Sequence, residues 1–144
     1  PLGNQEVNIS GSLDRVDKLL DTQTVRILDY KTGKVALKHG TDMDRIFSDS
    51  QHKEMFQGYL YAWLYKSMSP EARVKVGYYT ARHLSDGIQF LQRGADITEA
   101  ELEAFEKNLQ ILVEDMFNLP YTQTEDVNKC SYCPYNAICN RTTV

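Results

Sequence analysis

The chain has 144 residues, of which 42% are hydrophobic and 25% charged, and this composition is typical of one globular domain. It has no run of about eighteen apolar residues and no amino-terminal export signal, so we expect an intracellular protein rather than a membrane-spanning or secreted one. The net charge of −4 argues against a large basic surface, although a local basic groove is compatible with it.

The first part of the chain has the pattern of an antiparallel β-hairpin. Apolar and polar residues alternate over residues 7–20, which predicts a strand with one solvated face. A polar break at residues 21–24 separates this stretch from residues 25–31, which are rich in β-branched and aromatic side chains. We therefore predict two paired strands joined by a tight turn.

The remaining pattern alternates between helices and a second hairpin. Residues 33–50 lack clear periodicity and are predicted to form a loop, whereas residues 51–68 have apolar side chains at helical spacing. Residues 73–83 and 88–92 flank a Ser-Asp-Gly turn, and a capping box at residues 98–101 begins a helix that ends near Pro120. The order β-β-α-β-β-α predicts the α+β fold class, a mixed α/β arrangement with helices flanking the sheet.

Pairing within the first hairpin predicts a cluster of functional side chains. If residues 22–23 form a two-residue turn, Asp14 lies opposite Lys31. In the same register Val16 lies opposite Asp29. Opposed residues share a face, and so do residues two apart on one strand, so the two carboxylates and the lysine converge. Carboxylates this close repel unless a cation lies between them, and hard oxygen ligands suit Mg²⁺ or Mn²⁺.

A simpler interpretation of these residues remains open. Asp14 and its neighbouring charges are compatible with a solvated surface, and Asp29 with Lys31 is compatible with an ordinary surface ion pair. A register that differs by one residue would also turn every side chain to the opposite face. Spacing alone therefore does not decide between a metal site and surface charge.

Three ordered motifs carry a more specific signal. They are G-S-L-D-R-V-D at residues 11–17, I-L-D-Y-K-T-G-K at residues 27–34 and Q-G-Y-L-Y-A at residues 57–62. Together they resemble the RecB-like branch of the PD-(D/E)XK nuclease superfamily, in particular the carboxy-terminal nuclease domain of AddB-type helicase–nucleases. The resemblance implies a restriction-endonuclease-like core, in which helices flank a mixed β-sheet with antiparallel hairpins.

The resemblance also implies a role for each matching residue. Asp14, Asp29 and the backbone carbonyl of Tyr30 are then ligands of Mg²⁺ or Mn²⁺, and Lys31 is the catalytic lysine. The third motif implies that Gln57 and Tyr61, four residues apart and hence on one helix face, are catalytic residues that position metal-bound water or DNA.

Two charged residues of the first motif lie outside the predicted site, and one expected metal ligand is missing from it. Arg15 and Asp17 match the first motif, but strand parity turns them to the other face, so we predict a structural ion pair. Family members often take a further acidic or histidine ligand from a helix upstream of the first strand, and no residue here matches it. Glu6 is about 26 Å from Asp14 along a straight strand, which is too far for both to bind the same metal ion. We therefore expect a nuclease core over residues 1–120 that is truncated at its amino terminus and lacks a complete site.

The last part of the chain, residues 121–144, is a polar tail with three cysteines. Cys130, Cys133 and Cys139 have the spacing C-x2-C-x5-C, and close thiolates favour an iron–sulfur cluster or zinc. This spacing resembles the carboxy-terminal part of a four-cysteine [4Fe–4S] site in RecB-like nucleases, whose first cysteine precedes the nuclease motifs. We expect the cluster in the full-length protein and no intact cluster in this fragment, with zinc and inert cysteines as alternatives.

The resemblance implies a function as well as a fold. We expect a Mg²⁺-dependent DNA nuclease of the prokaryotic cytoplasm, specifically an exonuclease, that acts with a helicase in DNA recombination and repair. Two alternatives remain open. One is a stand-alone nuclease of the CRISPR-adaptation type, and the other is a non-catalytic module that binds DNA ends.

Overall fold

The structure is a computed structural model that describes residues 6–82, 84–131 and 133–141. The chain divides into two compact units, Pro1–Glu114 and Asp115–Val144. The strands of the described part all belong to the larger unit. Among the described residues, no helix has both the length and the apolar character that crossing a membrane requires.

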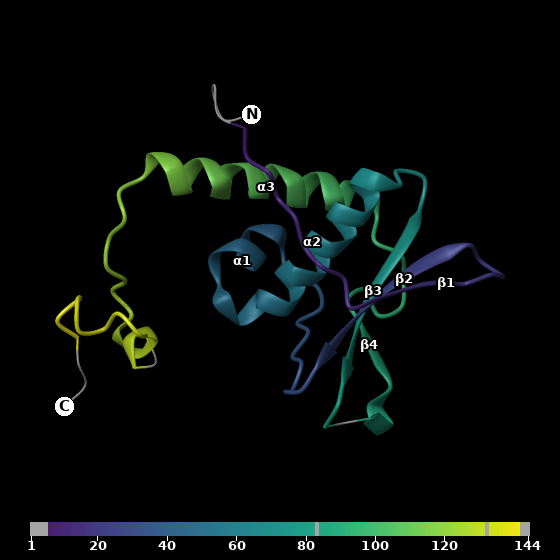
Figure 1. Ribbon diagram of the computed structural model, residues 1–144, viewed down its shortest axis with the longest axis horizontal. Coiled ribbons are helices and arrows are strands. Elements are labelled where there is room, and N and C mark those ends of the chain that lie inside the picture. Colours follow the sequence, from purple (N-terminus) through teal and green to yellow (C-terminus); the bar gives the residue numbers. More distant parts are fainter. Residues whose placement is uncertain (1–5, 83, 132, 142–144) are drawn as a thin grey trace. The chain divides into compact units, whose positions relative to one another are not determined.

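Within the described residues, four strands form one mixed sheet in the order β1-β2-β3-β4 (Figure 1). Strands β1 (Arg15–Lys18) and β2 (Thr24–Lys31) are antiparallel. Strand β3 (Arg73–Thr80) is parallel to β2, and β4 (Ile88–Phe90) is antiparallel to β3. A parallel pair requires a long crossover, and the chain between β2 and β3 supplies it.

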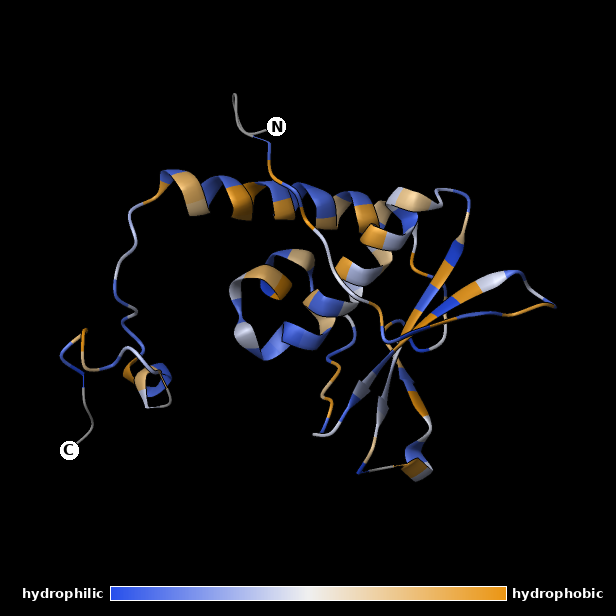
Figure 2. Ribbon diagram, in the orientation of Figure 1, coloured by the Kyte–Doolittle hydropathy of each residue, from blue (hydrophilic) through white to orange (hydrophobic). Residues whose placement is uncertain are grey.

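Helices α1 and α2 belong to this crossover and lie on one side of the sheet (Figure 1). Helix α1 spans Met43–Ser48, a 3-10 helix follows at Ser50–His52, and α2 spans Lys53–Met68. Helix α3 spans Glu99–Asn118, with hydrophobic and hydrophilic surfaces alternating along it (Figure 2). Its apolar side buries Leu102, Phe105 and Leu109, as expected of an amphipathic helix.

The predicted fold class and most of the predicted elements are confirmed. The helix expected over residues 51–68 is α2 with a 3-10 turn before it, and the predicted capping box begins α3. There the Thr98 N–H donates to Glu101 Oε2 at 2.8 Å. The loop predicted over residues 33–50 is wrong in part because it contains α1, whose first turn is capped by Asp42. Six residues are too few to display helical periodicity.

The predicted register of the first hairpin is wrong by two residues. Val16 pairs with Ile27 rather than with Asp29, and Asp14 precedes β1 instead of lying opposite Lys31 within it. The strand predicted over residues 7–20 is also shorter, since β1 begins only at Arg15. Because the shift is an even number of residues, the side chains of the paired strands keep their predicted faces.

Turn chemistry explains this shift. The Leu19 N–H donates to the Thr24 carbonyl at 2.9 Å, so the turn comprises residues 20–23 and not residues 22–23. Gln23 has a φ of 56°, in the left-handed region. A two-residue hairpin turn favours asparagine or glycine at its centre, and the β-branched Thr22 suits it poorly. The longer turn needs only one residue with positive φ.

The hydrophobic core of the larger unit lies between the sheet and the helices. Its members come from both central strands, from α2 and from α3. They include Val25 and Ile27 of β2, Val74, Val76 and Tyr78 of β3, Tyr59 and Ala62 of α2, and Phe105 of α3. Alternate residues of β2 and β3 therefore point toward the helices, and Asp29 lies on this face of β2 because it is two residues after Ile27.

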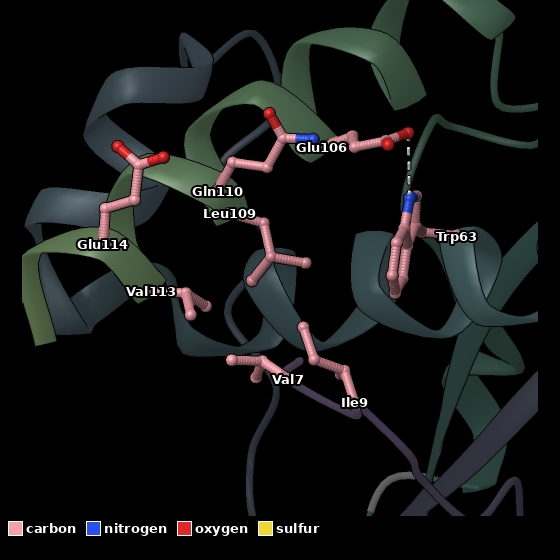
Figure 3. A pocket seen from close by; sticks show the side chains of 8 residues that line it. All are labelled: Val7, Ile9, Trp63, Glu106, Leu109, Gln110, Val113 and Glu114. Atoms are coloured by element: carbon pink, nitrogen blue, oxygen red, sulfur yellow. Dashed lines mark hydrogen bonds between the residues drawn. The ribbon is translucent and has the colours of Figure 1, made fainter. Parts of the chain in front are cut away.

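A groove of about 390 Å³ runs beside α2 and α3 (Figure 3). Val7, Ile9, Leu109 and Val113 form its apolar part, and Trp63 donates from Nε1 to Glu106 at 3.2 Å. No residue of the three sequence motifs lines it. The site predicted from the motifs lies elsewhere, where β2 meets α2.

Candidate active site

Asp29 is a buried carboxylate at the junction of β2 and α2. It is 4% exposed and lies two residues after Ile27, whose side chain is in the core. Residues two apart on a strand share a face, so the core-facing side of β2 carries Asp29 toward the helices. An ionised carboxylate is costly to bury unless its neighbours compensate for lost water. The groups around Asp29 therefore define the candidate site.

Helix α2 supplies two of these neighbours. Gln57 Nε2 and the Tyr61 hydroxyl each donate to Asp29 Oδ1 at 3.2 Å. Gln57 Nε2 also donates to the Tyr61 hydroxyl oxygen at 2.6 Å. Burial raises the pKa of the Tyr61 phenol. The nearby Asp29 carboxylate raises this pKa further, whereas the hydrogen bond from Gln57 lowers it. Tyr61 is therefore protonated at neutral pH and able to donate.

Lys31 supplies the positive charge beside Asp29. Its Nζ lies 2.8 Å from Asp29 Oδ2 and donates to Gln57 Oε1 at 2.7 Å. It also lies 5.6 Å from the centre of the Tyr78 ring, within the range of a cation–π interaction. Asp29 Oδ2 is buried and, among the described residues, has the Lys31 ammonium as its one polar partner. This oxygen keeps lone pairs for a further cation.

Asp14 reaches the same region from the segment just before β1. The Tyr30 N–H donates to Asp14 Oδ2 at 3.0 Å, which holds this exposed carboxylate against the backbone next to Asp29. The Tyr30 side chain lies on the opposite face of β2, half exposed and edge-on to Tyr79. The structure thus brings together Asp29, Lys31, Gln57 and Tyr61 directly, whereas Asp14 joins them through the main chain of Tyr30.

Sequence reasoning missed two residues that shape this site. Tyr78 is fully buried opposite Asp29 on the parallel strand β3, and its hydroxyl donates to the Glu54 carbonyl of α2. Gly58 allows α2 to approach closely, since a Cβ there would lie 3.0 Å from Leu91 Cδ1 and 3.2 Å from the Tyr78 hydroxyl. The alternation along residues 73–80 predicts that the Tyr78 side chain points toward the core. The sequence does not predict which residue of β2 lies beside it.

The charges on the other face of the hairpin form a separate cluster. Arg15 Nε lies 2.8 Å from Asp17 Oδ1, and Arg26 Nη2 lies 2.6 Å from Asp17 Oδ2. Hydrogen bonds from Arg15 and then Arg26 hold the pKa of the Asp17 carboxyl below its usual value. The predicted ion pair between Arg15 and Asp17 is thus observed, with Arg26 as an additional partner.

The cysteines lie in the smaller unit, where a 3-10 helix spans Val127–Cys130. All three are free thiols, and Arg141 Nη1 donates to the buried Cys130 Sγ at 3.7 Å. Over residues 6–82, 84–131 and 133–141, no group of three or more histidine, cysteine or acidic side chains is arranged to hold a metal ion. As they lie here, Cys130, Cys133 and Cys139 do not fit an iron–sulfur cluster.

Comparison with family models finds a match over nearly the whole chain. The family model described as the PD-(D/E)XK nuclease superfamily matches residues 1–140. Comparisons with curated proteins and with solved structures find no significant match. The family match covers the sheet, both sides of the Asp29 site and the cysteines, and the mixed sheet flanked by helices is consistent with a restriction-endonuclease-like fold. The chain therefore belongs to the PD-(D/E)XK nuclease superfamily, whose members are nucleases.

Proposed function

We propose that this chain is a Mg²⁺-dependent nuclease that hydrolyses DNA phosphodiester bonds at Asp14, Asp29 and Lys31. The buried carboxylate of Asp29, with Lys31 on one oxygen and Gln57 and Tyr61 on the other, is the observation that carries the proposal. An ionised carboxylate is costly to bury, so one that several polar side chains hold inside a core is a candidate functional group.

The oxygen atoms of the site fit a hard divalent cation. In the described part of the chain, the buried Asp29 Oδ2 has only the Lys31 ammonium beside it, and Asp14 accepts from the Tyr30 N–H through Oδ2 alone. The two carboxylates, with the Tyr30 carbonyl as a further candidate ligand, would hold Mg²⁺ or Mn²⁺. A bound cation of this kind polarises a phosphate oxygen and lowers the pKa of a coordinated water.

The protein side chains have separate roles in the proposed reaction. Lys31 offsets the negative charge that develops on the phosphate as the oxygen of water bonds to phosphorus and the ester oxygen leaves. Gln57 fixes the Lys31 ammonium, since its Oε1 accepts from Nζ at 2.7 Å. Tyr61 donates to Asp29 Oδ1 and so directs the other oxygen of that carboxylate toward the cation.

Cleavage of end-labelled DNA by the full-length protein and by its Lys31→Ala variant tests this function. We expect Mg²⁺-dependent cleavage by the wild type and a loss of at least about a hundredfold in the variant, the effect of losing one charge-stabilising group. Circular dichroism checks that the variant is folded. Wild-type cleavage rates in a folded Lys31→Ala protein would exclude the proposed chemistry.

A second candidate function is a non-catalytic module that binds DNA ends. One observation favours it, because the described residues contain no arrangement of three or more acidic, histidine or cysteine side chains around a metal position. The two functions differ in metal dependence. Tight DNA binding without cleavage in either Mg²⁺ or Mn²⁺ would support the binding module and reject the nuclease.

The three motifs resemble those of RecB-like nucleases, and this resemblance supports a more specific activity. We propose an exonuclease that works beside a helicase in recombination and repair, with the cysteines contributing to a [4Fe–4S] cluster in the full-length protein. Iron, sulfide and zinc analysis of that protein tests the cluster. Zinc in place of iron, or neither metal, would reject it without affecting the proposed nuclease site.

A further inference from the structure

A second groove, of about 570 Å³, opens where β2 ends and α2 begins. It shares Lys31 and Gln57 with the candidate active site, so it leads directly away from the buried Asp29 carboxylate. Lys34 lines it from the segment that follows β2, and Lys53 lines it from the first turn of α2. The groove is therefore continuous with the proposed reaction centre and is built by two separate elements.

The charge of this groove is opposite to that of the whole chain. The chain has 16 basic and 20 acidic residues, whereas the groove is lined by three lysines and one acidic residue, Glu54. Glu54 offsets part of this charge, since its Oε1 lies 3.9 Å from Lys53 Nζ, but three lysines against one carboxylate leave the groove with a net charge of +2. A net negative protein thus presents positive charge beside its proposed catalytic lysine.

Lys34 and Lys53 have their ammonium groups available for a ligand. The Lys53 side chain is 79% exposed, and Lys34 is exposed with no ion pair or hydrogen bond in the described part of the chain. Lys31 differs from both, because Asp29, Gln57 and the Tyr78 ring hold it in place. The three lysines of the groove therefore have two different roles.

The spacing of these lysines follows the groove outward from the site. Lys53 is four residues before Gln57 on α2, so it lies on the same helix face and about 6 Å further along the axis. Lys34 follows Lys31 by three residues. A ligand with a single phosphate bound at Lys31 would not contact both Lys34 and Lys53. A nucleic-acid strand carries further phosphates on either side of the one being cleaved, and these can reach both lysines.

We propose that Lys34 and Lys53 are positioning residues that bind the backbone phosphates of a DNA strand next to the phosphate being cleaved. This inference rests on the proposed nuclease function and extends it to the path of the substrate. Ammonium groups bind phosphate as point charges without reading the bases. The two lysines therefore contribute affinity and register of the strand, while the chemistry stays with Asp29 and Lys31.

Binding of a labelled single-stranded DNA oligonucleotide in EDTA, measured by fluorescence anisotropy over a range of salt, tests the groove without any catalysis. The proteins are the wild type, the double variant Lys34→Gln with Lys53→Gln, and Lys107→Gln, which removes an exposed lysine of α3 outside the groove. We expect the double variant to bind more weakly and to lose about 1.4 from the slope of log K against log salt, about 0.7 for each phosphate contact. Lys107→Gln should match the wild type.

The steady-state cleavage of the same oligonucleotide in Mg²⁺ separates this inference from the proposed function. We expect the double variant to raise KM and to leave kcat near the wild-type value. If the wild type cleaves DNA and the double variant has the salt slope and KM of the wild type, the groove assignment is wrong and the nuclease stands. If the double variant loses binding but the wild type never cleaves, the groove stands and the nuclease fails. Absence of DNA binding by the wild type overturns the groove assignment.

Discussion

Asp29 illustrates how one residue can carry a functional hypothesis. Its carboxylate follows the core residues Val25 and Ile27 on one face of β2, and the groups around it include a cation, an amide and a phenol. A structural ion pair needs only the lysine. The amide and phenol on Oδ1 leave Oδ2 oriented toward Lys31, where a further cation can bind. At the scale of residues, the neighbours of Asp29 hold its carboxylate in a fixed orientation, as expected of a metal ligand.

Tyr61→Phe tests this orientation. The change removes the hydroxyl that donates to Asp29 Oδ1. A hydrogen bond to a charged group contributes about 1.5–3 kcal/mol, so we expect kcat/KM for DNA cleavage to fall about tenfold or more. Tyr65→Phe is the matched control, since Tyr65 lies on the same helix and packs against the core. Equal cleavage rates for the two variants would show that Tyr61 only fills space.

At the scale of elements, the site depends on how closely the strands and α2 approach one another. Tyr78 connects β3 to α2 through the Glu54 carbonyl and carries Lys31 over its ring. The neighbouring residue, Gly77, faces β4 instead, and a Cβ there would lie 2.5 Å from Ile88 Cγ2. The pairing of β3 with β4 therefore requires glycine at this position.

Gly77→Ala is predicted to destabilise the sheet. The added methyl group overlaps Ile88 Cγ2 and meets Phe90 Cδ1 at 3.1 Å, and such overpacking costs about 1–3 kcal/mol. We expect a lower midpoint of urea unfolding. Gly33→Ala is the control, because a Cβ at Gly33 has no heavy atom within 4 Å and its backbone is outside the left-handed region. A Gly77→Ala midpoint equal to that of the control would refute the close approach of β4.

The elements also show which parts of the fold can be predicted from the sequence. The faces of Asp29 and Lys31 follow from a period of two residues, which is local and does not depend on the partner strand. The register of β1 against β2 depends on the length of the turn between them. This turn has no asparagine or glycine at its centre, so the sequence does not predict its length. Tyr78 could not be assigned to Asp29, because a parallel neighbour is fixed by the crossover rather than by adjacent residues.

At the scale of the whole molecule, charge is a poor guide to function in this chain. The net charge of −4 argued against a basic surface, yet lysines gather where β2 meets α2. Acidic residues are spread over other surfaces, including Glu106 and Glu114 beside the apolar groove of Figure 3. Local placement of a few charges decides what a nuclease binds, because screening limits the reach of the rest.

The central claim is that the buried Asp29 carboxylate binds a divalent cation together with Asp14. Isothermal titration of Mn²⁺ into the wild-type chain, Asp29→Asn and Asp17→Asn tests it most directly. Asp17 is an acidic residue of the same hairpin that is neutralised by Arg15 and Arg26 on the other face, so it serves as the control. We predict binding by the wild type and Asp17→Asn and its loss in Asp29→Asn. Equal binding by all three proteins, or none by the wild type, would contradict the account.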